Sequence, residues 1–464
     1  MAKLKFPGTT KASSNRIPFA DALRVWIKIS LLSFGGPAGQ IALMHRVLVE
    51  EKKWISESRF LHALNYCMLL PGPEAQQFAT YVGWLLHRTP GGLVAGTLFV
   101  LPGAFVILAL SILYAGYQDL SFVQAIFFGI KAAVLAVVIE ALLRIGKRAL
   151  KNSFMVSLAV ASFVGIFFFE VPFPLIMVMA GLIGFIGERL SPGTFLVIKG
   201  REPNVNDETR IVDAALIDGQ LDHTRPSRAR ALRVTIVCLA LWFGPVAVLA
   251  ALLGFGHVYV QEGIFFSKMA VVTFGGAYAV LAYVAQEAVN NYGWLAPGEM
   301  LDGLGMAETT PGPLIMVVQF VGFMGAYRHP GLLDPMLAGF LGAMITTWVT
   351  FVPCFLWIFL GAPYIEALHG NRSLSAALSA ITAAVVGVIL NLAAWFGLHV
   401  VFAQVSEVRT FGMTLRIPVW ETVDVAALAL AVAALVAMLR FKVGMIPTLT
   451  ISAMVGAIYK LTLI

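Results

Sequence analysis

The stretch Leu69-Leu70-Pro71-Gly72-Pro73 interrupts a run of apolar residues, and its last three residues recur 240 positions later as Pro311-Gly312-Pro313. The same offset places Phe34-Gly35-Gly36 on Phe274-Gly275-Gly276. Glycine and proline interrupt helices, so these motifs predict helices that break inside apolar segments. One constant offset across several such motifs indicates an internal duplication.

The duplication divides the chain into two repeats. The first covers residues 17–187, and the second, with an insertion of about eleven residues, covers 257–463. A tail (1–16) precedes them, and a polar linker (188–230) and one further apolar helix (231–253) join them. If each repeat crosses a membrane an even number of times, the single joining helix inverts the second repeat relative to the first.

The composition identifies lipid as the main solvent of this chain. Hydrophobic residues make up 59% of the sequence and charged residues only 12%, whereas about a quarter of a soluble domain is charged. Several apolar runs are long enough to cross a bilayer. We therefore expect an all-α polytopic membrane protein built from two inverted-topology repeats with broken or re-entrant helical hairpins.

Other classes of protein find little support in the sequence. The three cysteines are isolated, and no clustered histidines or phosphate-binding loop occurs. The net charge of +7 comes largely from short loops rather than from a nucleic-acid-binding face. We expect no metal, no cofactor, no nucleic-acid partner and no enzymatic activity, and the sequence leaves a homodimer open.

Loop charges suggest how the broken segments lie. The loop 45–59 is basic, whereas its counterpart 286–302 contains no Lys or Arg and three acidic residues. Basic loops stay in the cytoplasm, so the two loops face opposite sides. Because the N-terminal tail is also basic, we favour re-entrant hairpins, which leave the N-terminus cytoplasmic. The alternative is thirteen full crossings, and both arrangements invert the repeats.

Helices that begin at such breaks would point their N-termini into the membrane. Free N–H groups and the helix dipole at these ends attract anions. An alternative is that the motifs only allow a kink or close packing. Hydroxyl and amide side chains near the breaks could contact a solute or satisfy the broken backbone. The candidate substrate-binding residues are Ser33, Gly35, Gly36, Gln40, Pro71, Gly72, Glu74, Gln76, Gln77, Thr273, Gly275, Gly276, Thr309, Thr310, Gly312 and Gln319.

Four charged residues near the breaks are candidates for other roles. Lys28 and Lys268 precede the breaks by five residues and could balance the charge of an anion, or extend to the membrane surface instead. Glu74 and Glu308 are intramembrane acids and so candidates for proton coupling. Glu74 could equally stabilise the first turn of its helix.

Three runs resemble the hallmark blocks of the chromate ion transporter family, long two-domain form. They are Ser33-Phe34-Gly35-Gly36-Pro37, the run from Leu69 to Gln77, and the run from Gly91 to Gly103, and the second repeat carries the pattern again at residues 273–276 and 309–313. The resemblance implies secondary efflux of chromate, a tetrahedral dianion, across the bacterial inner membrane, with sulfate as a competitor. A transporter or channel for another anion or small solute is the alternative.

Overall fold

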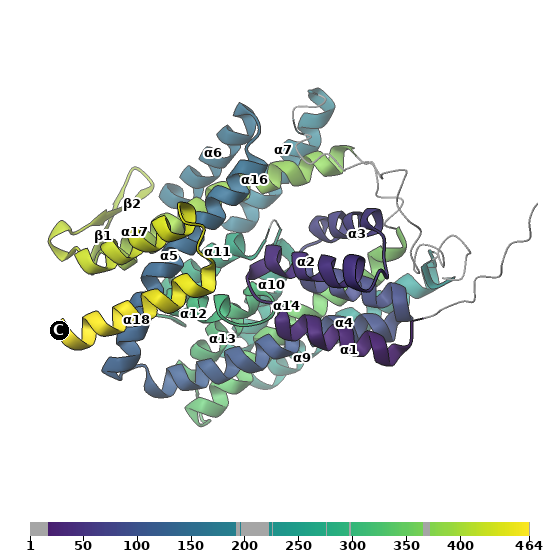
Figure 1. The fold of residues 1–464 in the computed structure, drawn as a ribbon, viewed down its shortest axis with the longest axis horizontal. Helices are drawn as coiled ribbons and strands as arrows, with labels where there is room; N and C mark the ends of the chain where they lie inside the picture. Colours follow the sequence, from purple (N-terminus) through teal and green to yellow (C-terminus); the bar gives the residue numbers. More distant parts are fainter. Residues whose placement is uncertain are drawn as a thin grey trace, which may run out of the picture.

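The computed structural model describes residues 17–191, 195, 222–224, 226–274, 276–296, 298–364 and 372–463. The predicted tail, most of the predicted linker and Gly275 lie outside these residues. Within them the fold is mostly helical, with helices packed side by side (Figure 1). The N-terminal half contains α1 (Phe19–Leu32), α2 (Gly36–His45), η1 (Arg46–Glu51), α3 (Glu57–Leu69), α4 (Glu74–Tyr117), α5 (Ser121–Ala149), α6 (Ser153–Phe169) and α7 (Phe173–Leu190).

The short η2 (Asp222–Thr224) and the joining helix α9 (Arg228–Leu253) precede the second half. That half contains α10 (Val258–Val272), α11 (Ala277–Asn290), α12 (Glu299–Glu308), η3 (Leu314–Met316), α13 (Val317–Arg328), α14 (Pro335–Gly361), η4 (Ala362–Tyr364), α16 (Arg372–Val401), β1 (Val405–Thr410), β2 (Met413–Pro418), η5 (Trp420–Thr422), α17 (Val425–Leu439) and α18 (Met445–Leu463). The two halves contain broken helices at the positions that the duplication predicts.

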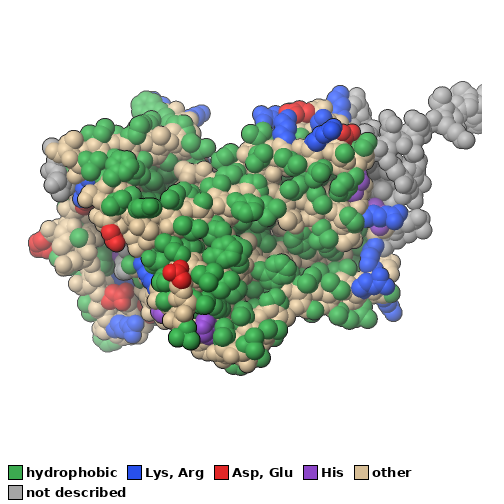
Figure 2. Space-filling model, turned by 90° about the horizontal axis from the view of Figure 1, so that it is seen from below, with side chains coloured by type: hydrophobic (Ala, Val, Ile, Leu, Met, Phe, Trp, Pro, Cys, Tyr) green, Lys and Arg blue, Asp and Glu red, His purple; other side chains and the backbone are tan. Residues whose placement is uncertain are grey.

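Seven helices of the described chain are long and apolar enough to cross a membrane. They are α4, α5, α7, α9, α14 with η4, α16 and most of α18. Large hydrophobic side chains remain exposed along them and cover the middle of the face seen in Figure 2, where several Lys and Arg side chains gather at the right-hand end. An apolar exterior of this extent requires lipid, so the chain is a multi-pass membrane protein.

The expectation of an all-α fold was wrong in one place. Strands β1 and β2 pair in antiparallel register, from Val405 opposite Pro418 to Thr410 opposite Met413. Phe411 and Gly412 connect them with φ angles of +49° and +74°. Two consecutive positive φ values are typical of a tight hairpin turn. Both strands lie with the C-terminus at the left-hand end of Figure 1.

Helix α4 is two helices that fold back on each other. His87 and Arg88 have non-helical backbone angles, and Arg88 has a φ of +56°. A Cβ built at Gly91 would lie 2.3 Å from the carbonyl oxygen of Gly83, and one built at Gly96 would lie 2.2 Å from Oγ1 of Thr80. Residues 80 and 96 would be about 24 Å apart along a straight helix. The segments before and after residue 87 therefore pack antiparallel, through glycines.

The chain also reverses direction at the break between α1 and α2. Lys28 Nζ lies 3.0 Å from Glu51 Oε2, although 23 residues separate the two. A straight helix of that length would hold them about 35 Å apart. This return is the geometry that a re-entrant hairpin needs.

Small residues allow the long helices to approach closely. Gly129 of α5 packs against Gly456 of α18, Gly184 of α7 against Ala376 of α16, and Gly387 of α16 against Ala159 of α6. At each glycine an added Cβ would lie 1.9 to 2.6 Å from backbone atoms of the neighbouring helix. Helices in lipid gain little from hydrophobic burial and associate through such close contacts.

A buried ion pair joins the two halves. Lys131 of α5 lies 3.1 Å from Oδ2 of Asp302 of α12, and the Tyr114 hydroxyl donates a hydrogen bond of 2.8 Å to the same oxygen. Asp302 is 2% exposed. Lys131 thus pairs with a residue far away in the sequence. Glu140, an acid on the same helix as Lys131, pairs instead with Arg144 at 3.4 Å.

Breaking the Lys131–Asp302 pair should destabilise the fold. Lys131→Met leaves a buried carboxylate with a single hydrogen-bond donor, and because Lys131 is partly exposed we expect a loss of about 1–3 kcal/mol. Thermal unfolding of the purified protein measures this. Arg144→Met, on the same helix but in a more exposed pair, should cost less than about 1 kcal/mol. Equal losses in the two variants would contradict a role for Lys131 in joining the halves.

Candidate functional site

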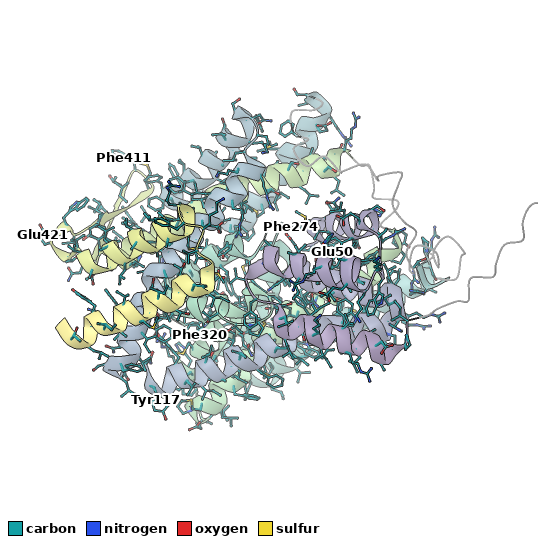
Figure 3. The ribbon with its side chains drawn as sticks, in the orientation of Figure 1. Glu50, Tyr117, Phe274, Phe320, Phe411 and Glu421 are labelled. Carbon is teal, nitrogen blue, oxygen red and sulfur yellow. The ribbon has the colours of Figure 1, made fainter. Side chains whose placement is uncertain are left out.

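Four chain breaks lie where the two halves meet. They separate α1 from α2, α3 from α4, α10 from α11, and α12 from η3. Glycines at these breaks have positive φ angles: +87° at Gly35, +67° at Gly36, +117° at Gly72, +102° at Gly276 and +104° at Gly312. Residues with a Cβ rarely adopt such angles, so the glycines allow the chain to turn there. Phe274, at the third break, lies near the middle of the view in Figure 3, far from Phe411 and Glu421.

Two equivalent hydrogen bonds connect the breaks across the halves. The N–H of Gly72 donates to the carbonyl of Thr273 at 2.8 Å, and the N–H of Gly312 donates to the carbonyl of Ser33 at 2.8 Å. Gly72 and Gly312 are equivalent under the offset of 240 residues, and so are Ser33 and Thr273, so the two bonds join equivalent pairs of residues. Such an exchange of partners is the pattern of a two-fold axis between similar units.

All four breaks contribute residues to one small cavity. Its volume is about 20 Å³, room for a single water molecule. The lining residues are Pro37, Gln40, Gly72, Pro73, Glu74, Ala75, Gly276, Ala277, Pro313, Leu314 and Ile315.

The helices that begin at this cavity have no side-chain caps. No side chain accepts a hydrogen bond from the first turn of α2, α4, α11 or η3, which continues into α13. Elsewhere in the described chain, Ser56, Asn152, Ser227, Asp334 and Asp424 cap helix starts in this way. Uncapped N-termini keep free N–H groups and a partial positive charge. Four such N-termini border this one cavity.

Open space adjoins two of the breaks. A Cβ built at Gly35, Gly36 or Gly276 would meet no atom within 4 Å, whereas one built at Gly72 would lie 2.9 Å from Nε2 of Gln77. The glycines of the first break in each half therefore have open space beside their backbone. At the second break Gly72 is crowded, whereas a Cβ built at Gly312 would meet its nearest neighbours at 3.4 Å, an ordinary contact distance.

Most of the predicted polar residues bind backbone atoms in this conformation. Gln40 donates to the carbonyl of Gly312, and Gln77 donates to the carbonyl of Pro71 at 2.7 Å. Hydroxyl groups of four other residues donate to helix carbonyls three or four residues earlier. They are Ser33, Thr273, Thr309 and Thr310, of which Thr309 alone is exposed.

Gln76 and Gln319 differ from the other polar residues. Both are fully buried, and neither side-chain amide atom of either residue has a hydrogen-bond partner among the described residues. Buried amides without partners are uncommon and call for an explanation such as water or a solute. These two residues thus carry donors that remain free for a ligand.

The two predicted acids have different surroundings. Glu74 lines the cavity directly. Glu308 is 2% exposed and accepts a hydrogen bond from the Tyr278 hydroxyl. The offset places leucine opposite Glu74 and methionine opposite Glu308, so each acid belongs to one half only.

The predicted lysines are exposed and do not line the cavity. Lys28 is exposed and binds Glu51, and this hydrogen bond lowers the pKa of the Glu51 carboxyl below its ordinary value. Lys268 is also exposed. In this conformation neither ammonium group lies among the residues that line the cavity.

Sequence reasoning missed the residues that pack behind the proline-glycine breaks. A Cβ built at Gly103 would lie 2.6 Å from the carbonyl oxygen of Pro311, and one built at Gly72 would lie 3.1 Å from Sγ of Cys354. Gly103 and Cys354 occupy equivalent positions after the insertion in the second repeat. The insertion in the second repeat aligns Pro102 with Pro353, but this alignment gives no partner for either Gly103 or Cys354.

A multi-pass membrane protein whose related halves meet at broken helices has the architecture of a secondary transporter. The chain belongs to the chromate transporter family, which matches residues 20–185 and 260–458. This membership makes it a transporter rather than an enzyme.

Two bacterial relatives support the assignment. A chromate transport protein of Pseudomonas aeruginosa is 31% identical over 390 residues, covering 82% of each chain. A chromate transport protein of Cupriavidus metallidurans is 27% identical over 390 residues, covering 82% of this chain and 84% of the relative. No solved structure matches the fold.

Proposed function

We propose that this protein exports chromate across the bacterial inner membrane by secondary transport, with sulfate as a competing substrate. Its relatives are named as chromate transport proteins. The observation that carries the proposal is the convergence of four uncapped helix N-termini on one cavity between the halves. Such ends bind oxyanions through backbone N–H groups, without a fixed cation.

The binding site in this proposal lies at the junction of the four breaks. The backbone around Gly35, Gly36 and Gly276 gives a tetrahedral anion close access, and Gln76 and Gln319 supply amide donors that lack partners here. Gly275 would belong to the same surface. The remaining hydroxyl and amide side chains hold the broken backbone in place, and the two lysines attract the anion at longer range.

The two repeats are then inverted copies that alternate around this site. The exchange of partners between Gly72–Thr273 and Gly312–Ser33 supports a two-fold relation, and the single joining helix α9 supports an axis in the membrane plane. A cavity of about 20 Å³ is too small for an oxyanion. This conformation is therefore occluded, and the hairpins must separate before the anion enters.

Membrane potential provides a driving force for export. Moving one charge through 100 mV changes the free energy by about 2.3 kcal/mol, so a dianion gains about twice that value when it leaves an interior-negative cell. No nucleotide hydrolysis is needed. Glu74 lines the anion site, so its ionised form would repel the dianion and its protonated form would admit it.

Chromate uptake into inverted membrane vesicles tests the function. Vesicles that contain the protein should accumulate radiolabelled chromate faster than empty vesicles, and excess sulfate should reduce the rate because both anions are tetrahedral dianions. An unrelated monovalent anion serves as the control competitor. Uptake equal to that of empty vesicles would reject chromate as the substrate and direct the search to other anions.

The role of Glu74 has a separate test. If its proton controls anion entry, chromate uptake should rise as the pH on the side of entry falls, and Glu74→Gln should remove this dependence. Glu308→Gln should do the same only if Glu308 carries the coupled proton. Rates that ignore a pH gradient in the wild type, and stay unchanged in both variants, would exclude proton coupling through these acids.

A further inference from the structure

Glu262 is a fully buried acid with no hydrogen-bond partner among the described residues. It lies in the second turn of α10, has an exposed fraction of 0%, and neither carboxyl oxygen has a donor. Its Oε1 lies 2.9 Å from a Cβ built at Gly325, and its Oε2 lies 3.0 Å from one built at Gly342. The carboxyl group is therefore held where α10 meets the contact between α13 and α14.

Within the described part of the chain, no cation pairs with this carboxyl group. Helix α14 contains no Asp, Glu, Lys, Arg or His, and α9 carries its basic residues at the opposite end. On α13, Arg328 binds Glu299 at 2.6 Å and the carbonyl of Trp294 at 2.8 Å. The adjacent His329 ring contacts the carbonyl of Gly325 at 2.9 Å, and Tyr259 of α10 donates to the carbonyl of Ala338 at 3.4 Å.

Packing alone does not require an acid at this position. The offset of 240 residues places Ala22 of α1 opposite Glu262, and Ala22 is buried at 2% exposure. The first half thus builds the equivalent helix contact with a methyl group. The second half instead carries a charged group whose burial is costly without a partner.

A second polar group without a partner lies on the same contact. Thr346 Oγ1 has no hydrogen-bond partner in the part of the chain that the structure describes, and a Cβ built at Gly322 would lie 2.1 Å from it. Thr346 follows Gly342 by one helical turn. The contact between α13 and α14 therefore contains two unsatisfied polar groups in otherwise apolar surroundings.

We propose that Glu262 is a proton-binding site that is loaded in this conformation and releases its proton when α10 separates from α13 and α14. Protonation removes the charge that burial would otherwise penalise. Glu262 lies about 6 Å along the helix from the start of α10, at the end where Arg328 meets Trp294. A small separation of these helices would expose the carboxyl group to the solution at that end.

The link of this proton to transport rests on the proposed function. Helix α10 leads directly to the break at Thr273 and Gly276, so a movement that opens the anion cavity also moves Glu262. Proton release on one side would then accompany anion movement. Glu262 differs from Glu74 in this scheme because it does not line the anion cavity.

Infrared difference spectroscopy tests proton binding without any transport. The spectrum of the wild type minus that of Glu262→Gln at neutral pH should contain the carbonyl band of a protonated carboxylic acid. The band should shift in Glu262→Asp, which keeps the acid. Thermal unfolding shows whether Glu262→Gln folds. If it does not, Glu262→Ala replaces it, because alanine is the residue at the equivalent position of the first half, Ala22. Absence of the band would show an ionised Glu262 and overturn the proposal.

Proteoliposomes with an internal pH-sensitive dye test the coupling. The number of protons moved for each chromate should fall by one in Glu262→Gln and stay unchanged in Glu140→Gln, a control acid in an ion pair. An unchanged ratio in Glu262→Gln, or a requirement for sodium in place of a proton gradient, would overturn the coupling. If the wild type carries no chromate, the proposed function fails, and the infrared result still decides whether Glu262 binds a proton.

Discussion

Chromate uptake is expected to fall by about fivefold to a hundredfold when Gly72 or Gly312 is replaced with alanine, since backbone strain of about 1–3 kcal/mol corresponds to a change of that size. The φ angles of +117° and +104° lie outside the left-handed region that residues with a Cβ can adopt. A Cβ at Gly72 would also lie 2.9 Å from Nε2 of Gln77 and 3.1 Å from Sγ of Cys354. Relief of this strain would displace the N–H groups that bind Thr273 and Ser33.

Gly331→Ala is the matched control for these variants. Gly331 also has a positive φ, of +61°, but this value lies within the left-handed region, and its built Cβ meets no atom within 4 Å. We expect nearly normal uptake and expression for this variant. Radiolabelled uptake, normalised to the amount of folded protein, separates a defect at the site from a loss of protein. Equal losses in all three variants would mean that replacing any glycine of positive φ impairs uptake, whether or not it lies at a break.

The duplication predicted the positions of the helix breaks because glycine and proline act locally. Pro71-Gly72-Pro73 and Pro311-Gly312-Pro313 interrupt their helices regardless of what surrounds them. The constant offset also predicted which residues would be equivalent, and the paired hydrogen bonds of Gly72 and Gly312 follow that equivalence. The helix breaks and their equivalence between the halves could therefore be predicted from the sequence alone.

Partners across the molecule could not be predicted in the same way. Lys131 meets Asp302, and Lys28 meets Glu51, only after the chain has folded back. Glu262 appeared in the sequence as one acid near the start of an apolar segment, and its burial depends on the glycines of two other helices. Hydropathy reports the average character of a segment and cannot report which face of it is enclosed.

The reversal within α4 shows a further limit of sequence patterns. Gly83, Gly91 and Gly96 were visible in the sequence, but glycines in a membrane helix fit a kink, a close contact or a turn equally well. The structure shows that they serve a close contact between two antiparallel segments. The turn itself uses a positive φ at Arg88, a residue type that gives no such signal.

Gly103→Ala is expected to destabilise the protein and to reduce uptake, although Gly103 lies far from the second half in the sequence. Its built Cβ would lie 2.6 Å from the carbonyl oxygen of Pro311, a backbone atom that cannot move without shifting the break at Gly312. Overpacking of this kind costs about 1–3 kcal/mol. Thermal unfolding measures the loss of stability, and vesicle uptake measures the effect on the site.

Gly116→Ala, in the same helical segment, separates crowding from helix propensity. Its built Cβ would meet only Met336 Cε, at 3.6 Å, an ordinary contact. Alanine favours a helix over glycine by about 1 kcal/mol, so this variant should be neutral or slightly more stable. A Gly103→Ala protein as stable and active as Gly116→Ala would show that the break at Gly312 tolerates displacement. The positions of the helix N-termini would then not depend on the tight contact between the halves, and the proposed anion site would lose its main structural support.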